Sequence, residues 1–405
     1  MKKIKTISMT KQILIGAFLG ILIGIIFKEK VIGIKIIGDI FLRMLMMPVV
    51  LLVMGAVIEA VGNLDYHELG RIGGKMFFWF MISTFLAAAL GMILGKIFMS
   101  GEIASVIQGT YIVETVDQSI YDIILNFFPS NIFSSMVDSN MIQIIVFSII
   151  FGVTLSAWNA EHKNCKFLGM LKEFNGIILK MITIIMKIAP IGICALVAYT
   201  TGSTGIKVII PLMKFLLIFA VGSCLHLIFV ILFVSFYCKV NPIRIANKLS
   251  RMTLFAFATT SSAISLPIKM EDSEKKLGVS QKVSRLVNPL GMTLNSNGLA
   301  MYLALSCIMI AQFYGIEISA INMIKIVILS TLACLGTVAV PGGGLIALTM
   351  VVPSLGLPLE SIALLSGIDW FSGMFRTVLN VDIDALIAMI IAKDEKELDY
   401  QILNS

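Results

Sequence analysis

A stripe of charged and polar side chains lies near the C-terminus of this 405-residue chain. It comprises Asp369, Arg376, Thr377, Asn380 and Asp384. At about 100° per residue, all five fall within an arc of roughly 100°, which is one face of a helix. Because an ionisable group inside a bilayer costs about 2.5–3.5 kcal/mol, such a helix is expected to line a polar site. A helix end among lipid headgroups is the alternative, but apolar residues continue to Ile391.

The composition indicates the environment of that helix. Hydrophobic residues make up 58% of the chain and charged residues 14%, and many apolar segments approach the length of a membrane span. The predicted fold class is therefore an all-α polytopic membrane protein in contact with a lipid bilayer. The net charge of +7 is spread over short loops, which argues against a nucleic-acid partner.

Patterns typical of enzymes and metal centres are not found in the sequence. Six cysteines are scattered without a CxxC pair, so we expect buried side chains and no disulfide or metal site. His67, His162 and His226 form no catalytic or metal-binding spacing. The chain is therefore predicted not to be an enzyme.

Six apolar segments make up the first half of the chain. Membrane spans are expected at residues 13–27, 34–61, 76–98, 141–158, 168–199 and 206–237. Residues 102–140 are too polar to span and should form an external loop. Basic residues mark every second connection, apart from Lys28, Lys30 and Lys35, so both termini are expected to be cytoplasmic. The basic start is interpreted as a tail and not as a cleaved signal.

The second half begins with a segment that does not fit a full span. Residues 239–276 carry basic residues at both ends and the cluster TTSS, residues 259–262, in the middle. Neither arm reaches the ~20 apolar residues that a span needs. A crossing would also place Lys269 and the basic residues that follow it outside the cell. We therefore expect a re-entrant hairpin that enters and leaves on the cytoplasmic face and lines a protein-enclosed cavity.

A similar unit follows in the opposite orientation. A span at residues 287–313 is interrupted by NSNG, and apolar arms at 321–335 and 345–353 flank GTVAVPGGG. Three glycines after a proline do not continue a helix, so a second re-entrant hairpin is expected here. The sequence thus predicts eight transmembrane helices plus two re-entrant helical hairpins. Such inverted repeats are typical of secondary transporters.

Four short sequences resemble the signatures of a known family, the dicarboxylate/amino acid:cation symporters. They are TTSSAISLP at 259–267, NSNGLAMY at 295–302, VPGGGLI at 340–346 and MFRTVLNVDID at 374–384. APIGICALVA at 189–198 is also similar to the family's fifth span. The resemblance runs from the first span to the last.

The resemblance implies a homotrimer that works by an elevator mechanism. A scaffold would comprise residues 1–75, with spans 1 and 2, and residues 102–205, with the external loop and spans 4 and 5. The moving transport domain would comprise span 3 (76–101), span 6 (206–240) and the transport core (241–405).

The same resemblance implies roles for individual residues. Arg376 matches the arginine that holds the distal carboxylate of the substrate, and guanidinium groups bind carboxylates with paired hydrogen bonds. Neutralisation of Asp369 or Asp384 is the alternative role for this arginine. The implied substrate-binding positions are Arg376, Thr377, Asn380, Gly373, Ser261, Ser262, Val340 and Gly342. The last two would close the site from the second hairpin.

Sodium is the co-transported cation that the resemblance implies. One site would combine the Asp384 side chain with the carbonyls of Gly291, Asn295 and Asn380. The other would use the carbonyls of Thr293, Cys334, Leu335 and Thr337, and would form when the outer hairpin closes. Oxygen ligands suit a hard monovalent ion.

Some positions depart from the family pattern. Gly373 stands where amino acid transporters of the family have an aspartate for the substrate's amino group, which favours plain C4-dicarboxylates. Asn297 and Phe80 replace residues of a third sodium site, although Ser83 and Thr84 can supply hydroxyls there, so fewer coupled ions are expected.

Two further positions differ from the family. Leu299 replaces a threonine near the distal carboxylate. Asp382 is an additional acid that points away from the polar stripe. It is expected to face another helix or to take up a proton.

The predicted function is secondary active symport in the cell (inner) membrane. Inward sodium flow would be coupled to the uptake of a small anionic substrate, either a dicarboxylate or an acidic amino acid. The alternatives are a proton-coupled C4-dicarboxylate symporter, a transporter for a different amino acid, and a degenerate paralogue that only binds.

Overall fold

The computed structural model describes residues 9–62, 72–99, 125, 128–138, 140–162, 166–204, 209–336 and 343–404. These residues are mainly helical, and an isolated antiparallel bridge joins Val279 to Leu398. Four of the described helices are long and apolar enough to cross a membrane, and a bent pair would add a fifth. The all-α class is thus confirmed, and the apolar helices fit a polytopic membrane protein. The number of spans stays a prediction.

The N-terminal helices follow the predicted spans, with one break that was not predicted. They are α1 (Met9–Phe27), the 3-10 helix η1 (Lys28–Ile34), α2 (Lys35–Met46), α3 (Val49–Gly62) and α5 (Gly74–Met99). The expected single span at 34–61 is therefore two helices, α2 and α3, that meet at Met47 and Pro48. Proline lacks the N–H of a helical hydrogen bond and its ring clashes with the preceding turn, which explains the break.

The middle of the chain shows a second break of this kind. Its helices are α7 (Ile132–Val137), α8 (Met141–Glu161), α9 (Phe167–Met186), α10 (Ala189–Thr204) and α11 (Ile209–Cys238). The expected span at 168–199 is bent by 55° between α9 and α10, next to Pro190. Most of the expected external loop lies outside the described residues.

The first predicted hairpin consists of α12 (Pro242–Thr259) and α13 (Ser262–Lys275). At the tip, Thr260 adopts the left-handed conformation with φ 51°, and the Ser261 side chain caps α13 by accepting a hydrogen bond from Ile264 N. Arg251 forms ion pairs across the open end with Asp272 and Glu271, at 3.0 and 3.1 Å. The two arms are therefore antiparallel.

The remaining helices include the interrupted span and the second pair of arms. They are α14 (Gln281–Leu294), α15 (Asn297–Phe313), α16 (Ala320–Ala333), η4 (Cys334–Gly336), α17 (Gly343–Ser354), η5 (Leu359–Ser361), α18 (Ile362–Ser366), α19 (Asp369–Asp394) and α20 (Tyr400–Asn404). The predicted interruption lies between α14 and α15, at Asn295 and Ser296. The tip between η4 and α17 lies outside the described residues, and with it Thr337, Val340 and Gly342.

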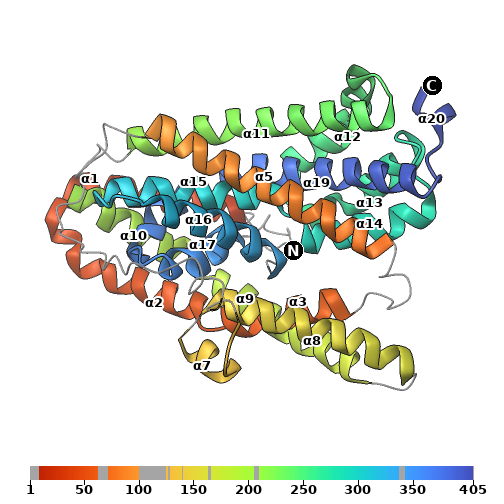
Figure 1. Ribbon diagram of the computed structural model, residues 1–405. Helices are drawn as coiled ribbons and strands as arrows, with labels where there is room; N and C mark the ends of the chain where they lie inside the picture. The colour runs from red at the N-terminus through yellow and green to blue at the C-terminus, as the bar shows by residue number, and fades with distance from the viewer. Residues whose placement is uncertain are drawn as a thin grey trace, which may run out of the picture.

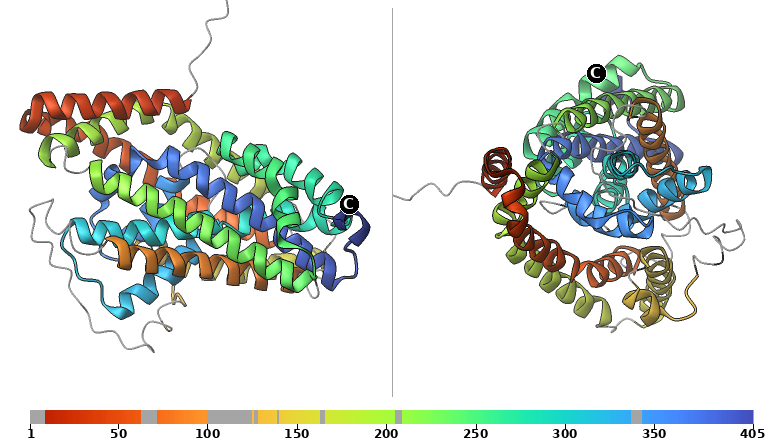
Figure 2. Two further views of the ribbon diagram at one scale, coloured as in Figure 1. Left: turned by 90° about the horizontal axis from the view of Figure 1, so that it is seen from above. Right: turned by 90° about the vertical axis from the view of Figure 1, so that its left-hand side faces the viewer.

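Helix α19 occupies the centre of the C-terminal half. It packs against α11, α12, α13, α14 and α15, and α5 lies along α15 (Figure 1). Seen end-on, α1, α2 and α3 form an arc along one side of this bundle (Figure 2). The helix that carries the polar stripe is thus surrounded by protein, which allows its charged groups to be paired away from lipid.

Candidate functional site

The polar stripe lies on α19 as the sequence predicts. Asp369, Thr377 and Asp384 are buried, while Arg376 and Asn380 are partly buried. The stripe divides into two layers, one around Arg376 in the first half of the helix and one around Asp384 two turns further on. Different helices contact each of the two layers.

In the first layer, the Arg376 guanidinium is held by its own helix and by an aromatic ring. Arg376 Nη1 lies 2.8 Å from Asp369 Oδ1, and Nη2 donates a hydrogen bond of 3.1 Å to the Asp369 carbonyl oxygen. The guanidinium also stacks over the Tyr302 ring of α15, with 4.5 Å to the ring centroid. The structure thus pairs Arg376 with Asp369, one of the two acids named for its alternative role, and the substrate-binding role stays a prediction.

The first turn of α17 lies against this layer. A methyl group added to Gly344, in that turn, would lie 1.5 Å from Arg376 Nη1. Only a residue without a Cβ atom allows so close an approach of the helix start to the guanidinium. By contrast, a methyl group at Gly373 would meet, among the described residues, only Arg376 Nη2, at 3.3 Å. The described residues therefore leave space for a small group on one side of the arginine.

The other predicted substrate residues lie around this layer with partners of their own. Thr377 Oγ1 donates to the Gly373 carbonyl at 2.8 Å, and Asn380 Oδ1 accepts from Gly298 N at 2.8 Å. Ser261 and Ser262 lie at the tip of the first hairpin, and no hydrogen bond joins them to Arg376 among the described residues. Close to this tip, the ring of Phe257 packs against Phe375, with centroids 5.5 Å apart.

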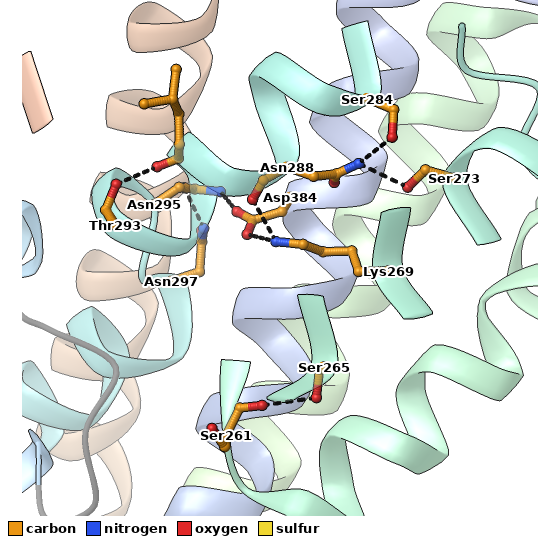
Figure 3. Close-up of polar contacts among 11 residues, drawn as sticks. Ser261, Ser265, Lys269, Ser273, Ser284, Asn288, Thr293, Asn295, Asn297 and Asp384 are labelled. Atoms are coloured by element: carbon orange, nitrogen blue, oxygen red, sulfur yellow. Dashed lines mark hydrogen bonds and ion pairs between the residues drawn. The ribbon is translucent and has the colours of Figure 1, made fainter. Parts of the chain in front are cut away.

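In the second layer, Asp384 is paired with a buried lysine (Figure 3). Lys269 Nζ donates to Asp384 Oδ2 at 2.6 Å and to the Asn288 carbonyl at 2.8 Å. Asn295 Nδ2 donates to the other carboxylate oxygen at 2.8 Å. A methyl group at Gly291 would lie 2.5 Å from the Asp384 carboxylate. The structure thus brings Asp384, Asn295 and Gly291 together, but with an ammonium group among them, and the sodium site stays a prediction.

The residues that the sequence relates to a third sodium site belong to a network of neutral side chains. Asn295 Oδ1 accepts hydrogen bonds from Ser83, Thr84 and Asn297, at 3.0, 3.1 and 2.7 Å. Asn297 Oδ1 in turn lies 3.2 Å from His226 Nε2 on α11. Because Asn297 is an amide, it brings no charge that could offset an ion, and the smaller number of coupled ions stays a prediction.

The residues of the second predicted cation site are only partly described. Cys334 and Leu335 are buried in η4, next to α14, and Cys334 Sγ donates to the Ser296 carbonyl at 3.3 Å. Thr293 is on α14, and its hydroxyl donates to the Leu290 carbonyl. Thr337 lies outside the described residues, so this site stays a prediction.

Asp382 lies on the opposite side of α19 from the stripe, as its position on the helix predicts. Asp382 Oδ2 accepts a hydrogen bond of 2.7 Å from Thr253 on α12, and the carboxylate is fully buried. Its partner is therefore the first arm of the first hairpin.

Lys269 is the main residue that the sequence did not identify. It was interpreted as one of several basic residues near the cytoplasmic end of the hairpin, yet it is fully buried. The buried residues of α13 are Ser262, Ser265, Lys269, Asp272 and Ser273. Their spacing of three and four residues is that of one helix face, and it is a signal that could have placed Lys269 inside.

Comparisons with known proteins identify the family of this chain. The model of the sodium:dicarboxylate symporter family matches residues 9–394. The chain is 33% identical to the proton/sodium-glutamate symport protein of Bacillus caldotenax, over 98% of this chain and 97% of that protein. It is 30% identical to the proton/glutamate-aspartate symporter of Escherichia coli (strain K12), over 98% and 95% of the two chains. The C4-dicarboxylate transport protein of Anaeromyxobacter sp. (strain K) is 27% identical, over 97% and 91%. This chain therefore belongs to the sodium:dicarboxylate symporter family.

Proposed function

We propose that this protein is a symporter that uses inward cation flow to take up a small C4-dicarboxylate. The observation that carries the proposal is the position of the Arg376 side chain and its ion-pair partner. Its guanidinium lies at the meeting point of α15, α17 and α19, and its only ion-pair partner among the described residues is an aspartate of its own helix. An arginine that binds an anionic substrate must be held in position, and its ion-pair partner must be replaceable by the substrate.

A substrate carboxylate suits this arginine. Arginine presents a planar fork that binds a carboxylate through two hydrogen bonds, and the Tyr302 ring keeps the plane of the fork fixed. The pair with Asp369 keeps the guanidinium neutralised when no substrate is present. We expect an entering carboxylate to compete with Asp369 for it.

The surroundings of Gly373 favour a plain dicarboxylate over an acidic amino acid. An amino acid would bring an ammonium group, which needs a carboxylate partner in a site shielded from water. Gly373 offers none, Asp384 is already paired with Lys269, and Asp382 points towards α12. Asp369, the remaining acid of the stripe, is the ion-pair partner of Arg376. Uptake of glutamate or aspartate, which some relatives carry out according to their names, is the second candidate activity.

The coupling ion we propose is sodium, bound at the predicted position formed by carbonyls of Thr293, Cys334, Leu335 and Thr337. Proton coupling is the rival, and the names of the relatives include both ions. The proposal also includes the homotrimer, the cytoplasmic termini, and the elevator division. In that division, α1–α3 and α8–α10 form the scaffold, and α5 with α11–α19 forms the moving domain.

Reconstitution of the purified protein into proteoliposomes tests the proposal. We expect labelled succinate to accumulate when sodium is higher outside, and unlabelled fumarate and malate to compete. Aspartate uptake that succinate fails to inhibit would contradict the dicarboxylate assignment. Succinate uptake that is unchanged when choline replaces sodium, and that follows an imposed pH gradient instead, would establish proton coupling. Binding without accumulation under any gradient would indicate a degenerate paralogue.

A further inference from the structure

We propose that Lys269 is a tethered cation that permanently takes the place of a transported ion beside Asp384. The inference rests on the proposed function, because it concerns which ions travel with the substrate. It changes the first of the two predicted sodium sites from an ion-binding site into an internal ion pair.

The geometry around the ammonium group is that of a bound cation. Lys269 Nζ lies 2.6 Å from a carboxylate oxygen of Asp384 and 2.8 Å from the Asn288 carbonyl oxygen (Figure 3). One carboxylate oxygen and one backbone carbonyl oxygen are the kind of ligand that a hard monovalent ion also prefers. The ammonium and a sodium ion would therefore compete for the Asp384 carboxylate.

Two other oxygens that were expected to bind the ion also have partners in the protein. Asp384 Oδ1 accepts from the Asn295 amide at 2.8 Å. The Gly291 carbonyl accepts the backbone N–H of Asn295, also at 2.8 Å. Both oxygens of the Asp384 carboxylate are thus already bonded to groups of the protein.

Burial makes the pair difficult to exchange. The side chains of Lys269 and Asp384 are 0% and 1% exposed. For sodium to bind at Asp384, the ammonium would have to give up its ion-pair partner. Asp382, a second buried acid within electrostatic range of Lys269, is hydrogen-bonded to Thr253. Breaking a buried ion pair leaves an uncompensated charge, which is strongly unfavourable. The lysine therefore excludes the ion instead of sharing the site with it.

A tethered cation has a consequence for the transport cycle. The charge of Asp384 is neutralised whether or not substrate is bound, so the transport domain does not need an ion here to return empty. Each cycle would then carry one cation fewer than a relative in which a free ion occupies this place. The predicted position at Cys334 and Leu335 remains available for a transported ion.

Thermal unfolding of the purified protein without substrate tests this inference directly. Sodium that binds at the other predicted site can raise the Tm of any variant, so we expect its effect, compared with choline, to be no larger in the wild type than in K269M/D384N. In K269M the methionine keeps most of the volume of the lysine side chain but leaves the Asp384 carboxylate without its ion-pair partner. Sodium can then bind to the carboxylate and should raise the Tm further. The double variant K269M/D384N removes the carboxylate as well and should lose that response. K275M is the matched control, because Lys275 is on the same helix but its side chain is 74% exposed.

Several outcomes would overturn the inference. A sodium response of the substrate-free wild type larger than that of K269M/D384N, or no additional response in a folded K269M, would do so. Should K269M fail to fold, the number of saturable binding sites for radioactive sodium in the substrate-free wild type decides instead: at most one site is expected, and two sites would overturn the inference. K269Q, which keeps a hydrogen-bond donor without the charge, is a second variant for the Tm assay.

Transport assays separate this inference from the proposed function. In proteoliposomes K269M should show a stronger dependence of succinate uptake on sodium than the wild type. If no dicarboxylate or amino acid is transported by the wild type, the proposed function fails. The Tm and sodium-binding measurements need no substrate, so they still decide the role of Lys269.

Discussion

The two layers of α19 each contain one ion pair, but the pairs differ in what surrounds them. Arg376 and Asp369 are on the same helix, and their side chains are 12% and 11% exposed. Lys269 and Asp384 come from different helices, are 115 residues apart in sequence and are almost completely buried. The first pair lies beside the first turn of α17, and the second lies between α13, α14 and α19.

The difference separates a pair that can exchange partners from one that cannot. A partly exposed pair loses little when an incoming anion replaces one partner, because water and the new partner compensate the charge. A fully buried pair is costly to break. We therefore expect the first layer to determine which substrate binds, and the second to determine stability and the number of transported ions.

Loss of the buried lysine is expected to have the largest effect. K269M leaves Asp384 buried without its partner, which should lower the free energy of unfolding by about 3–5 kcal/mol. D384N combined with K269M should recover much of that loss, because neither charge remains. Thermal unfolding in detergent without sodium measures both. Equal stability of K269M and the wild type would remove the distinction between the layers.

Loss of the substrate anchor should affect transport more than stability. R376A is expected to weaken succinate binding by about 2–5 kcal/mol, since a charged partner is removed from a mostly desolvated site. The loss in Tm should be smaller than that of K269M because the Asp369 side chain is 11% exposed, whereas that of Asp384 is 1% exposed. R376K keeps the charge but not the paired hydrogen bonds, and should recover binding only in part. A large Tm loss with unimpaired uptake would reverse the roles of the two layers.

A single methyl group at Gly344 should interfere with the first layer only. The added Cβ atom would overlap Arg376 Nη1, so G344A must displace the guanidinium or α17. Overpacking of this kind costs about 1–3 kcal/mol. We expect a higher KM for succinate, while the sodium response of the Lys269 variants is unaffected. G169A is a matched control, because no atom lies within 4 Å of a methyl group there.

An acid at position 373 should change the substrate preference with the smallest energetic effect. G373D places a carboxylate in the space beside Arg376, where it can bind the ammonium of an acidic amino acid. We expect roughly a tenfold shift from succinate towards aspartate in competition assays, which is about 1.4 kcal/mol. G373N has nearly the same size without the charge and should not produce the shift. If both variants favour aspartate equally, the charge is not the cause.

Much of the helical framework was predictable because its signals are local. The polar stripe of α19, the cap and left-handed turn at Thr260 and Ser261, and the interruption at Asn295 all depend on residues a few positions apart. The breaks at Pro48 and next to Pro190 were missed, although proline is a local signal. The long apolar runs were given more weight than the proline within them. A proline break is tolerated inside a membrane because neighbouring helices can satisfy the freed backbone hydrogen-bonding groups.

The sequence by itself determined the stripe on α19, its division between an arginine and an acid, and the absence of an acid at Gly373. These follow from helical periodicity and from residue identity. Only the tertiary structure decided which charges are partners, because Lys269 reaches Asp384 through the packing of α13 against α19. An electrostatic interaction depends on distance in space and on burial, and neither can be read from positions 115 residues apart. For that reason the cation beside Asp384 was expected to be sodium, and the structure shows an ammonium group of the protein itself.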